Sequence, residues 1–159
     1  MITSTYEYVK NFWTTFSSSI DVVKEYVACT TEHPADKFRN AKGGNVLFRP
    51  IGLIEFVKAS IAIAKVKSTT PQEVIASLAM VPLDLSEAPW NGILWDGKKI
   101  INRVNVTLIR YFFMLYYDDA LLDTETMKSF AQLYISATGF KGDEKKATEK
   151  IISSMKTHR

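Results

Sequence analysis

The chain has 159 residues, of which 47% are hydrophobic and 23% are charged, and its formal net charge is +3. This length favours one domain with enough chain to bury a core, and the composition excludes wholesale disorder. A single cysteine, Cys29, excludes an internal disulfide framework and a cysteine-based zinc site. The mild basic excess is compatible with contact to nucleic acid but does not establish it.

The sequence shows neither a targeting signal nor a membrane span. The amino-terminal segment lacks a basic region, a continuous apolar stretch and a small-residue cleavage site, so it is not a signal peptide. The most apolar window, residues 104–117, is interrupted by Asn105 and Arg110. A spanning helix needs about 20 mostly apolar residues, so this window is typical of a buried core helix. We expect a cytoplasmic protein without membrane contact.

Apolar residues recur at steps of three and four from Thr3 to about Cys29, which predicts one long amphipathic helix. Pro34 disfavours helix at the residue before it, and the polar residues that follow, with a Gly-Gly pair, indicate a loop or short turn. We therefore expect three segments: an amino-terminal helix at 1–32, a loop at 33–45 and a helical domain at 46–159.

The helical domain begins with a helix from residue 52 or 53 to Lys67. The next helix has a clear start signal, because Thr70 precedes a proline and Glu73 follows three residues later, as in a capping box. It stops before Pro82. Further helices are predicted over residues 104–117, from Asp123 to about Thr138, and from Asp143 to Lys156.

Asp96-Gly97 is a strong two-residue turn signal between two short apolar runs, which predicts a β-hairpin near residues 93–101. Together with the helical segments, this gives the fold class. The sequence predicts a mainly α domain of about five or six helices with one small β-hairpin.

Residues that could perform catalysis are scarce. The chain has no G-x-G-x-x-G, P-loop, G-x-S-x-G or H-E-x-x-H motif. His33 and His158 are its two histidines, and Cys29 with His33 makes a poor metal site without a further thiolate or imidazole nearby. We predict no catalytic residue, no metal site and no cofactor.

Arg49 lies in an apolar run, residues 46–52, that enters a helix. An unpaired buried charge is costly, so this cation is expected either to bond carbonyls or a carboxylate, or to contact a ligand or phosphate. Two roles are also possible for Trp90 and Trp95. They either fill the core with their indole N–H groups satisfied locally, or stack on nucleic acid bases beside nearby basic residues.

Two motifs are found in this part of the chain: F-R-P-I-G at residues 48–52 and P-W-N-G-I-L-W-D at residues 89–96. With the helices between and after them, to about Gly139, they resemble the C-terminal region of DGQHR-domain proteins. That family includes the DndB proteins of DNA phosphorothioation systems. The residues singled out from the two motifs are Phe48, Arg49, Pro50, Gly52, Trp90, Trp95 and Asp96.

The resemblance implies a DNA-modification or phage-defence context and also sets a limit. The Asp-Gly-Gln-His-Arg motif of the family belongs to an N-terminal domain similar to ParB-like nuclease folds, and this sequence lacks it. Residues 96–99 begin with Asp-Gly, as that motif does, but they are predicted to form a turn and are not the motif. The resemblance therefore implies a helical portion without the active-site-like half, and no nuclease or ATPase activity is carried over.

Two function hypotheses follow. In the first, the chain is a non-enzymatic module that binds DNA or regulates DNA modification. Arg103 and Arg110 are seven residues apart on the core helix and share a face. If this hypothesis is right, one exposed basic patch should contain Lys98, Lys99, Arg103 and Arg110.

In the second hypothesis, the chain is a structural or protein-interaction domain that docks onto a missing N-terminal domain, a partner subunit or another copy of itself. Its amino-terminal helix has more aromatic surface than one buried stripe needs, with Tyr6, Phe12, Trp13 and Phe16. We then expect an exposed apolar patch around Trp13 and Phe16. A stand-alone enzyme is the least favoured class, because no set of groups has the spacing that chemistry requires.

Overall fold

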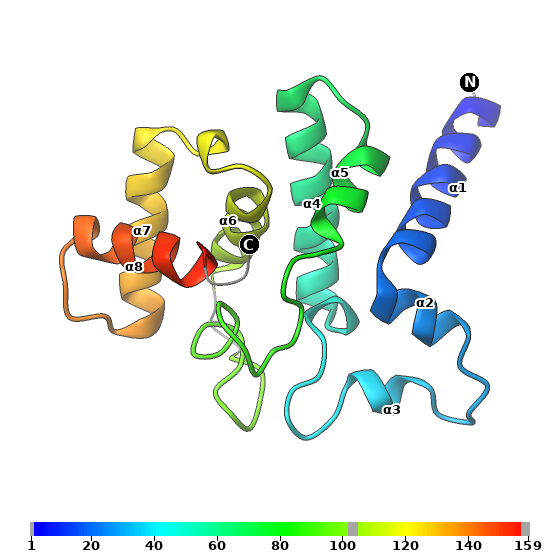
Figure 1. Ribbon diagram of the computed structural model, residues 1–159, viewed down its shortest axis with the longest axis horizontal. Coiled ribbons are helices and arrows are strands. Elements are labelled where there is room, and N and C mark those ends of the chain that lie inside the picture. Colours follow the sequence, from blue (N-terminus) through cyan, green and yellow to red (C-terminus); the bar gives the residue numbers. More distant parts are fainter. Residues whose placement is uncertain (1, 102–104, 157–159) are drawn as a thin grey trace.

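The computed structural model describes residues 2–101 and 105–156 (Figure 1). This part of the chain is mainly helical, as the sequence predicted, but it contains eight α-helices rather than five or six, and two short 3-10 helices. None of its helices is long and apolar enough to cross a membrane. The α-helices are α1 (Ile2–Ser19), α2 (Asp21–Val27), α3 (Ala35–Phe38), α4 (Pro50–Lys67), α5 (Pro71–Leu78), α6 (Val106–Tyr117), α7 (Thr124–Thr138) and α8 (Glu144–Lys156), and the 3-10 helices are η1 (Val46–Phe48) and η2 (Asp119–Leu121).

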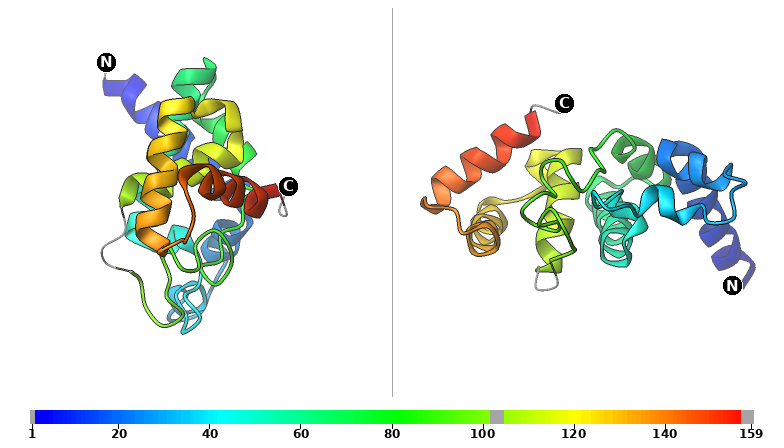
Figure 2. Two further views of the ribbon diagram at one scale, coloured as in Figure 1. Left: turned by 90° about the vertical axis from the view of Figure 1, so that its left-hand side faces the viewer. Right: turned by 90° about the horizontal axis from the view of Figure 1, so that it is seen from below.

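The helices form an elongated row, with α7 and α8 at one end and α1 and α2 at the other (Figure 2). At the centre α4 packs on α6, and α5 packs on both α1 and α4. One hydrophobic core extends from α1 to α8. At its centre the ring of Phe56 lies edge-on to Phe16 of α1 and Phe113 of α6, with centroid distances of 5.7 and 5.2 Å. The amino-terminal helices therefore share the core of the rest of the chain.

The long helix predicted from Thr3 to about Cys29 is two helices, because Ile20 adopts an extended conformation (φ −97°, ψ 112°) between α1 and α2. A run of serines at residues 17–19 precedes the break. Serine favours helix ends because its hydroxyl competes for nearby backbone groups. The side chain of Ile20 is buried in the core, which holds the break in place. As a result, α2 runs in a different direction from α1 (Figure 1), and its Tyr26 lies edge-on to Phe48, just before α4.

The predicted β-hairpin near residues 93–101 is wrong. In this segment the structure has isolated bridges, such as the one between Trp95 and Ile100, and no strands. The backbone N–H groups of Ile93, Leu94 and Trp95 all donate to the carbonyl of Trp90, at 2.8 to 3.1 Å. A tight turn thus uses the donors that a hairpin ladder would need.

The turn signal itself is confirmed. The carboxylate of Asp96 accepts hydrogen bonds from the N–H groups of Lys98 and Lys99, at 2.8 Å each. The N–H of Asp96 in turn donates to the Lys99 carbonyl at 3.2 Å. The sequence therefore located the reversal of the chain correctly, although no strands flank it.

Two predicted helix starts, at Thr70 and Asp123, are confirmed as well, whereas α4 begins at Pro50 and not at residue 52 or 53. Thr70 and Glu73 form a capping box at α5, in which the Thr70 hydroxyl accepts from the Glu73 N–H and the Glu73 carboxylate accepts from the Thr70 N–H. Asp123 caps α7 by accepting from the Thr126 N–H at 2.8 Å. At the end of α7, Gly139 adopts the left-handed conformation (φ 64°) that glycine favours.

The Glu73 cap predicts a loss of stability in acid. The hydroxyl of Thr69, then the N–H and hydroxyl of Thr70, donate to this carboxylate and lower its pKa below the ordinary 4.5. A group whose pKa is lower in the folded state stabilises the fold above its unfolded pKa, and loses that effect as the pH falls through the folded value. Thermal unfolding of the wild type and of Glu73→Gln should therefore converge as the pH falls below 4.5. A constant difference between the two melting curves at all pH values would contradict this origin of the stabilisation.

Candidate functional site

The segments that lead into the two family-like motifs are hydrogen bonded to each other in the structure. The N–H of Val46 donates to the carbonyl of Leu83 at 2.7 Å, and the N–H of Leu85 donates to the carbonyl of Gly44 at 2.8 Å. These bonds join the segment before α4 to the loop after α5. The approaches to the two motifs are thus held together, although most of α4 and all of α5 lie between the motifs in the sequence.

Both tryptophans of the second motif belong to the core. Trp90 is fully buried, and its indole N–H donates to the carbonyl of Pro82 at 2.8 Å. Trp95 is also buried and lies against Gly43, where an added Cβ would be 3.0 Å from the indole ring. Of the two alternatives left open by the sequence, the structure therefore shows the core-filling one.

The cations of the predicted basic patch have different surroundings. The Nε of Arg110 donates at 2.8 Å to the carboxylate of Glu55, which is 1% exposed. Arg110 therefore balances a buried charge and is not a free surface cation, which removes it from the predicted patch. Lys98 and Lys99 are exposed on the turn between α5 and α6, whereas Arg103 lies outside the described residues.

Only two of the four aromatic residues of the predicted partner face are exposed. Phe12 and Phe16 are buried, so the expectation of an exposed patch including Phe16 needs correction. The cause is the packing of α1 against α5 and α4, which covers the side of α1 that holds both phenylalanines. Tyr6 and Trp13 remain exposed, at 63% and 45% of their surfaces, and Val9 between them is exposed too. The candidate partner face is therefore reduced to the exposed residues Tyr6, Val9 and Trp13.

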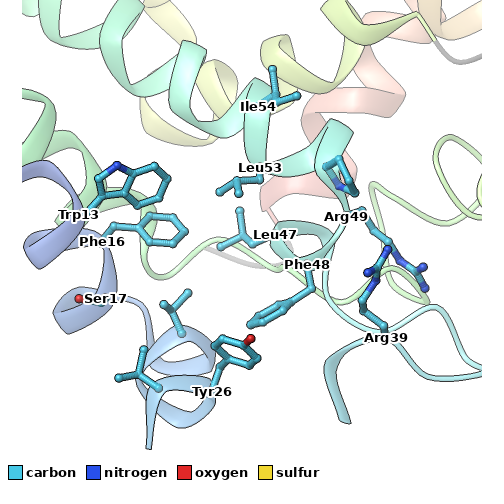
Figure 3. A pocket seen from close by; sticks show the side chains of 13 residues that line it. Trp13, Phe16, Ser17, Tyr26, Arg39, Leu47, Phe48, Arg49, Leu53 and Ile54 are labelled. Atoms are coloured by element: carbon cyan, nitrogen blue, oxygen red, sulfur yellow. The ribbon is translucent and has the colours of Figure 1, made fainter. Parts of the chain in front are cut away.

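A groove of about 670 Å³ opens beside Trp13, between α1, α2 and the start of α4, and we call it the α1–α4 groove (Figure 3). The break at Ile20 contributes to its shape, since α2, which follows the break, supplies Val23, Tyr26 and Val27 to its lining. Its volume falls within the range of ligand sites. The apolar wall consists chiefly of Trp13, Phe16, Tyr26, Leu47, Leu53 and Ile54.

Aromatic stacking stabilises one side of the groove. The ring of Phe48 stacks on Phe38 of α3 with a centroid distance of 4.6 Å, and Tyr26 lies edge-on to Phe48 at 5.0 Å. The hydroxyl-bearing ring of Tyr26 is partly exposed and is visible at the lower edge of the groove in Figure 3. Phe48, a residue of the first motif, therefore helps to build this site, and Pro50 begins α4 beside it.

Two guanidinium groups, those of Arg39 and Arg49, lie beside each other at one end of the groove (Figure 3). The Nη2 of Arg49 donates to the carbonyl of Gly43 at 2.5 Å, while its Nε is buried without a hydrogen-bond partner. Burial, and then the charge of Arg39, lower the pKa of Arg49. Among the described residues, no ion pair includes either arginine. This end of the groove therefore has positive charge without a matching acid.

Sequence reasoning missed three contributors to the groove. Arg39 lies in a polar stretch with no periodic pattern, and nothing in the sequence places it next to Arg49. Tyr26 and Ile54 each belong to a helix that was predicted, but the groove depends on the turn at Ile20, which was not. For Arg49 the structure shows the first expected role, since its side chain bonds a carbonyl, and contact with a ligand or phosphate stays a prediction.

The groove offers apolar surface and positive charge rather than groups for acid–base or metal chemistry. No cluster of three or more His, Cys, Asp or Glu side chains that could hold a metal is found within the described ranges. Cys29 does not line the groove, and its Sγ lies 3.1 Å from the hydroxyl of Thr31. The arrangement is suited to binding.

Comparison with known proteins gives no match: no family model, no curated protein and no solved structure is similar to the chain. The resemblance to DGQHR-domain proteins, and the DNA-modification context that it implies, stay predictions.

Proposed function

We propose that this chain is a non-enzymatic protein-interaction module, which holds an amphipathic helix of a partner protein in the α1–α4 groove. The observation that supports this most is the exposure of Trp13 at the edge of an apolar groove. A large aromatic side chain with 45% of its surface in water, next to a hollow lined by apolar groups, is typical of an interface that lacks its partner.

The exposed apolar surface continues beyond the groove along both helices. On α1, Tyr6 and Val9 lie seven and four residues before Trp13, and this spacing places all three on neighbouring parts of one helix face. On α4, Ile61 follows Ile54 by seven residues, and both are exposed. Seven residues span about 10 Å of helix. This length favours a helix as the occupant over a small molecule, because a small molecule would leave both stripes in water.

The test is a selection of displayed peptides of about 16 residues, or roughly four helical turns, on the full chain. Binding of the selected peptides is then compared between the wild type and two variants, Trp13→Glu and Ile54→Glu. Both changes are at exposed positions, so the fold should persist, and circular dichroism checks this. The matched control is Val66→Glu, an exposed apolar residue on another face of α4.

We expect the two groove variants to weaken binding by about tenfold or more, because each places a charge at an apolar contact, and Val66→Glu to bind as the wild type does. Selected peptides that bind all three variants equally, or the absence of binders above an uncoated surface, would contradict the proposal. A dimer in sedimentation that Ile54→Glu dissociates would also contradict it, since a second copy would then be the occupant.

A further inference from the structure

Positive charge is concentrated at one end of the α1–α4 groove. Arg39 and Arg49 border it there, and neither is in an ion pair with any described carboxylate. None of the residues that line the groove is an Asp or Glu. Two neighbouring guanidinium groups repel each other when no acid lies between them. Partial burial of Arg49 adds to the free energy that is needed to hold both charges there.

Hydrogen-bond donors are left over at the same end. A guanidinium has five N–H donors, and the structure shows one bond from Arg49, to the carbonyl of Gly43. The side chain of Arg39 is exposed at the groove edge. In addition, α4 begins at Pro50 without a side-chain cap, so the positive end of an 18-residue helix faces this region uncapped. A hydrogen-bond acceptor that also bears negative charge would complement Arg39, Arg49 and the positive end of α4 together.

We infer that the partner helix carries an aspartate or glutamate at the end that meets Arg39 and Arg49. This inference rests on the proposed function. It adds that the occupant is negatively charged and says at which end of the groove this charge lies. The stripe on α4 runs away from Arg49, which precedes this helix, toward Ile61. The stripe on α1 runs the same way toward Tyr6, since the first residues of α1 and the last of α4 lie on the same side of the molecule (Figure 1). The acidic residue therefore lies at one end of the bound segment, and its apolar anchors follow at helical spacing along the remainder.

The experiment repeats the peptide selection on the full-length wild type and on Arg39→Glu, and compares the residues that are enriched. Arg39 is exposed and its side chain makes no hydrogen bond or ion pair among those identified in the described chain, so this variant should fold. Lys42→Glu is the matched control, because it makes the same change of charge three residues away, at an exposed position that does not line the groove.

Peptides selected on the wild type and on Lys42→Glu should be enriched in Asp or Glu at one end, and those selected on Arg39→Glu should not. Replacing that acid by Asn or Gln should weaken binding to the wild type by about tenfold, and the loss should shrink in high salt. Peptides with apolar anchors that lose binding to Trp13→Glu, yet show no acidic preference, would overturn this inference while the proposed function stands. Peptides that bind Trp13→Glu unchanged would overturn both.

Discussion

Replacing Gly52 by alanine should destabilise the fold by about 3 kcal/mol or more, although alanine is the better helix former. Gly52 lies in the first turn of α4, directly against η1. An added Cβ would be 2.1 Å from the carbonyl oxygen of Val46 and 2.6 Å from its Cγ2. Val46 is fully buried, and its N–H is bonded to Leu83, so it cannot move without disturbing the loop after α5.

Urea unfolding followed by circular dichroism measures this effect. Ala62→Gly, in the middle of the same helix, is the control and should cost about 1 kcal/mol, as helix propensity predicts. If propensity alone mattered at position 52, Gly52→Ala would raise the stability by a similar amount. A variant as stable as the wild type, or more stable, would show that η1 does not hold the start of α4 as described.

Removing the side chain of Arg110 should lower the free energy of unfolding by about 3 kcal/mol, because it leaves a buried carboxylate poorly compensated. Glu55 accepts from the Nε of Arg110 and from the Nζ of Lys58, at 2.8 Å each. Lys58 is half exposed and keeps contact with water, so it replaces only part of the lost interaction. The pair also links α4 to α6, the two central helices.

Unfolding of Arg110→Ala and of a double variant, Glu55→Gln with Arg110→Met, tests this explanation. The double variant should be the more stable of the two, because no buried charge is left without a partner. Lys10→Ala disrupts an exposed pair with Glu7 at 4.0 Å and should have little effect. An Arg110→Ala variant no less stable than Lys10→Ala would contradict the role assigned to the Glu55 pair.

Local signals in the sequence predicted local features of the fold well. The capping box at Thr70 and the end of α7 at Gly139 depend on a few neighbouring residues, and both were found where expected. The errors arose where distant packing decides. The break at Ile20 places a buried side chain, and the absent hairpin reflects the three N–H groups that the Trp90 carbonyl accepts, which the Asp96-Gly97 signal does not show.

The candidate site was predictable only in part, for the same reason. Helical periodicity identifies an aromatic stripe on α1 but not how much of it α4 and α5 cover, so Phe16 and Trp13 were grouped together although one is buried. The partner of Arg110, Glu55, is 55 residues away in the sequence. The approach of Arg39 to Arg49 depends on the fold of the chain between α3 and α4, which no motif describes.

The most direct test of the proposed docking site uses the three tryptophans of the chain. Trp13 lies at the groove, whereas Trp90 and Trp95 are buried in the core. In the full chain labelled with fluorotryptophan, a selected peptide should shift the ¹⁹F resonance of Trp13, assigned with Trp13→Phe, and leave the other two in place. Peptide binding that leaves the Trp13 resonance unchanged would contradict the assignment of the groove as the docking site.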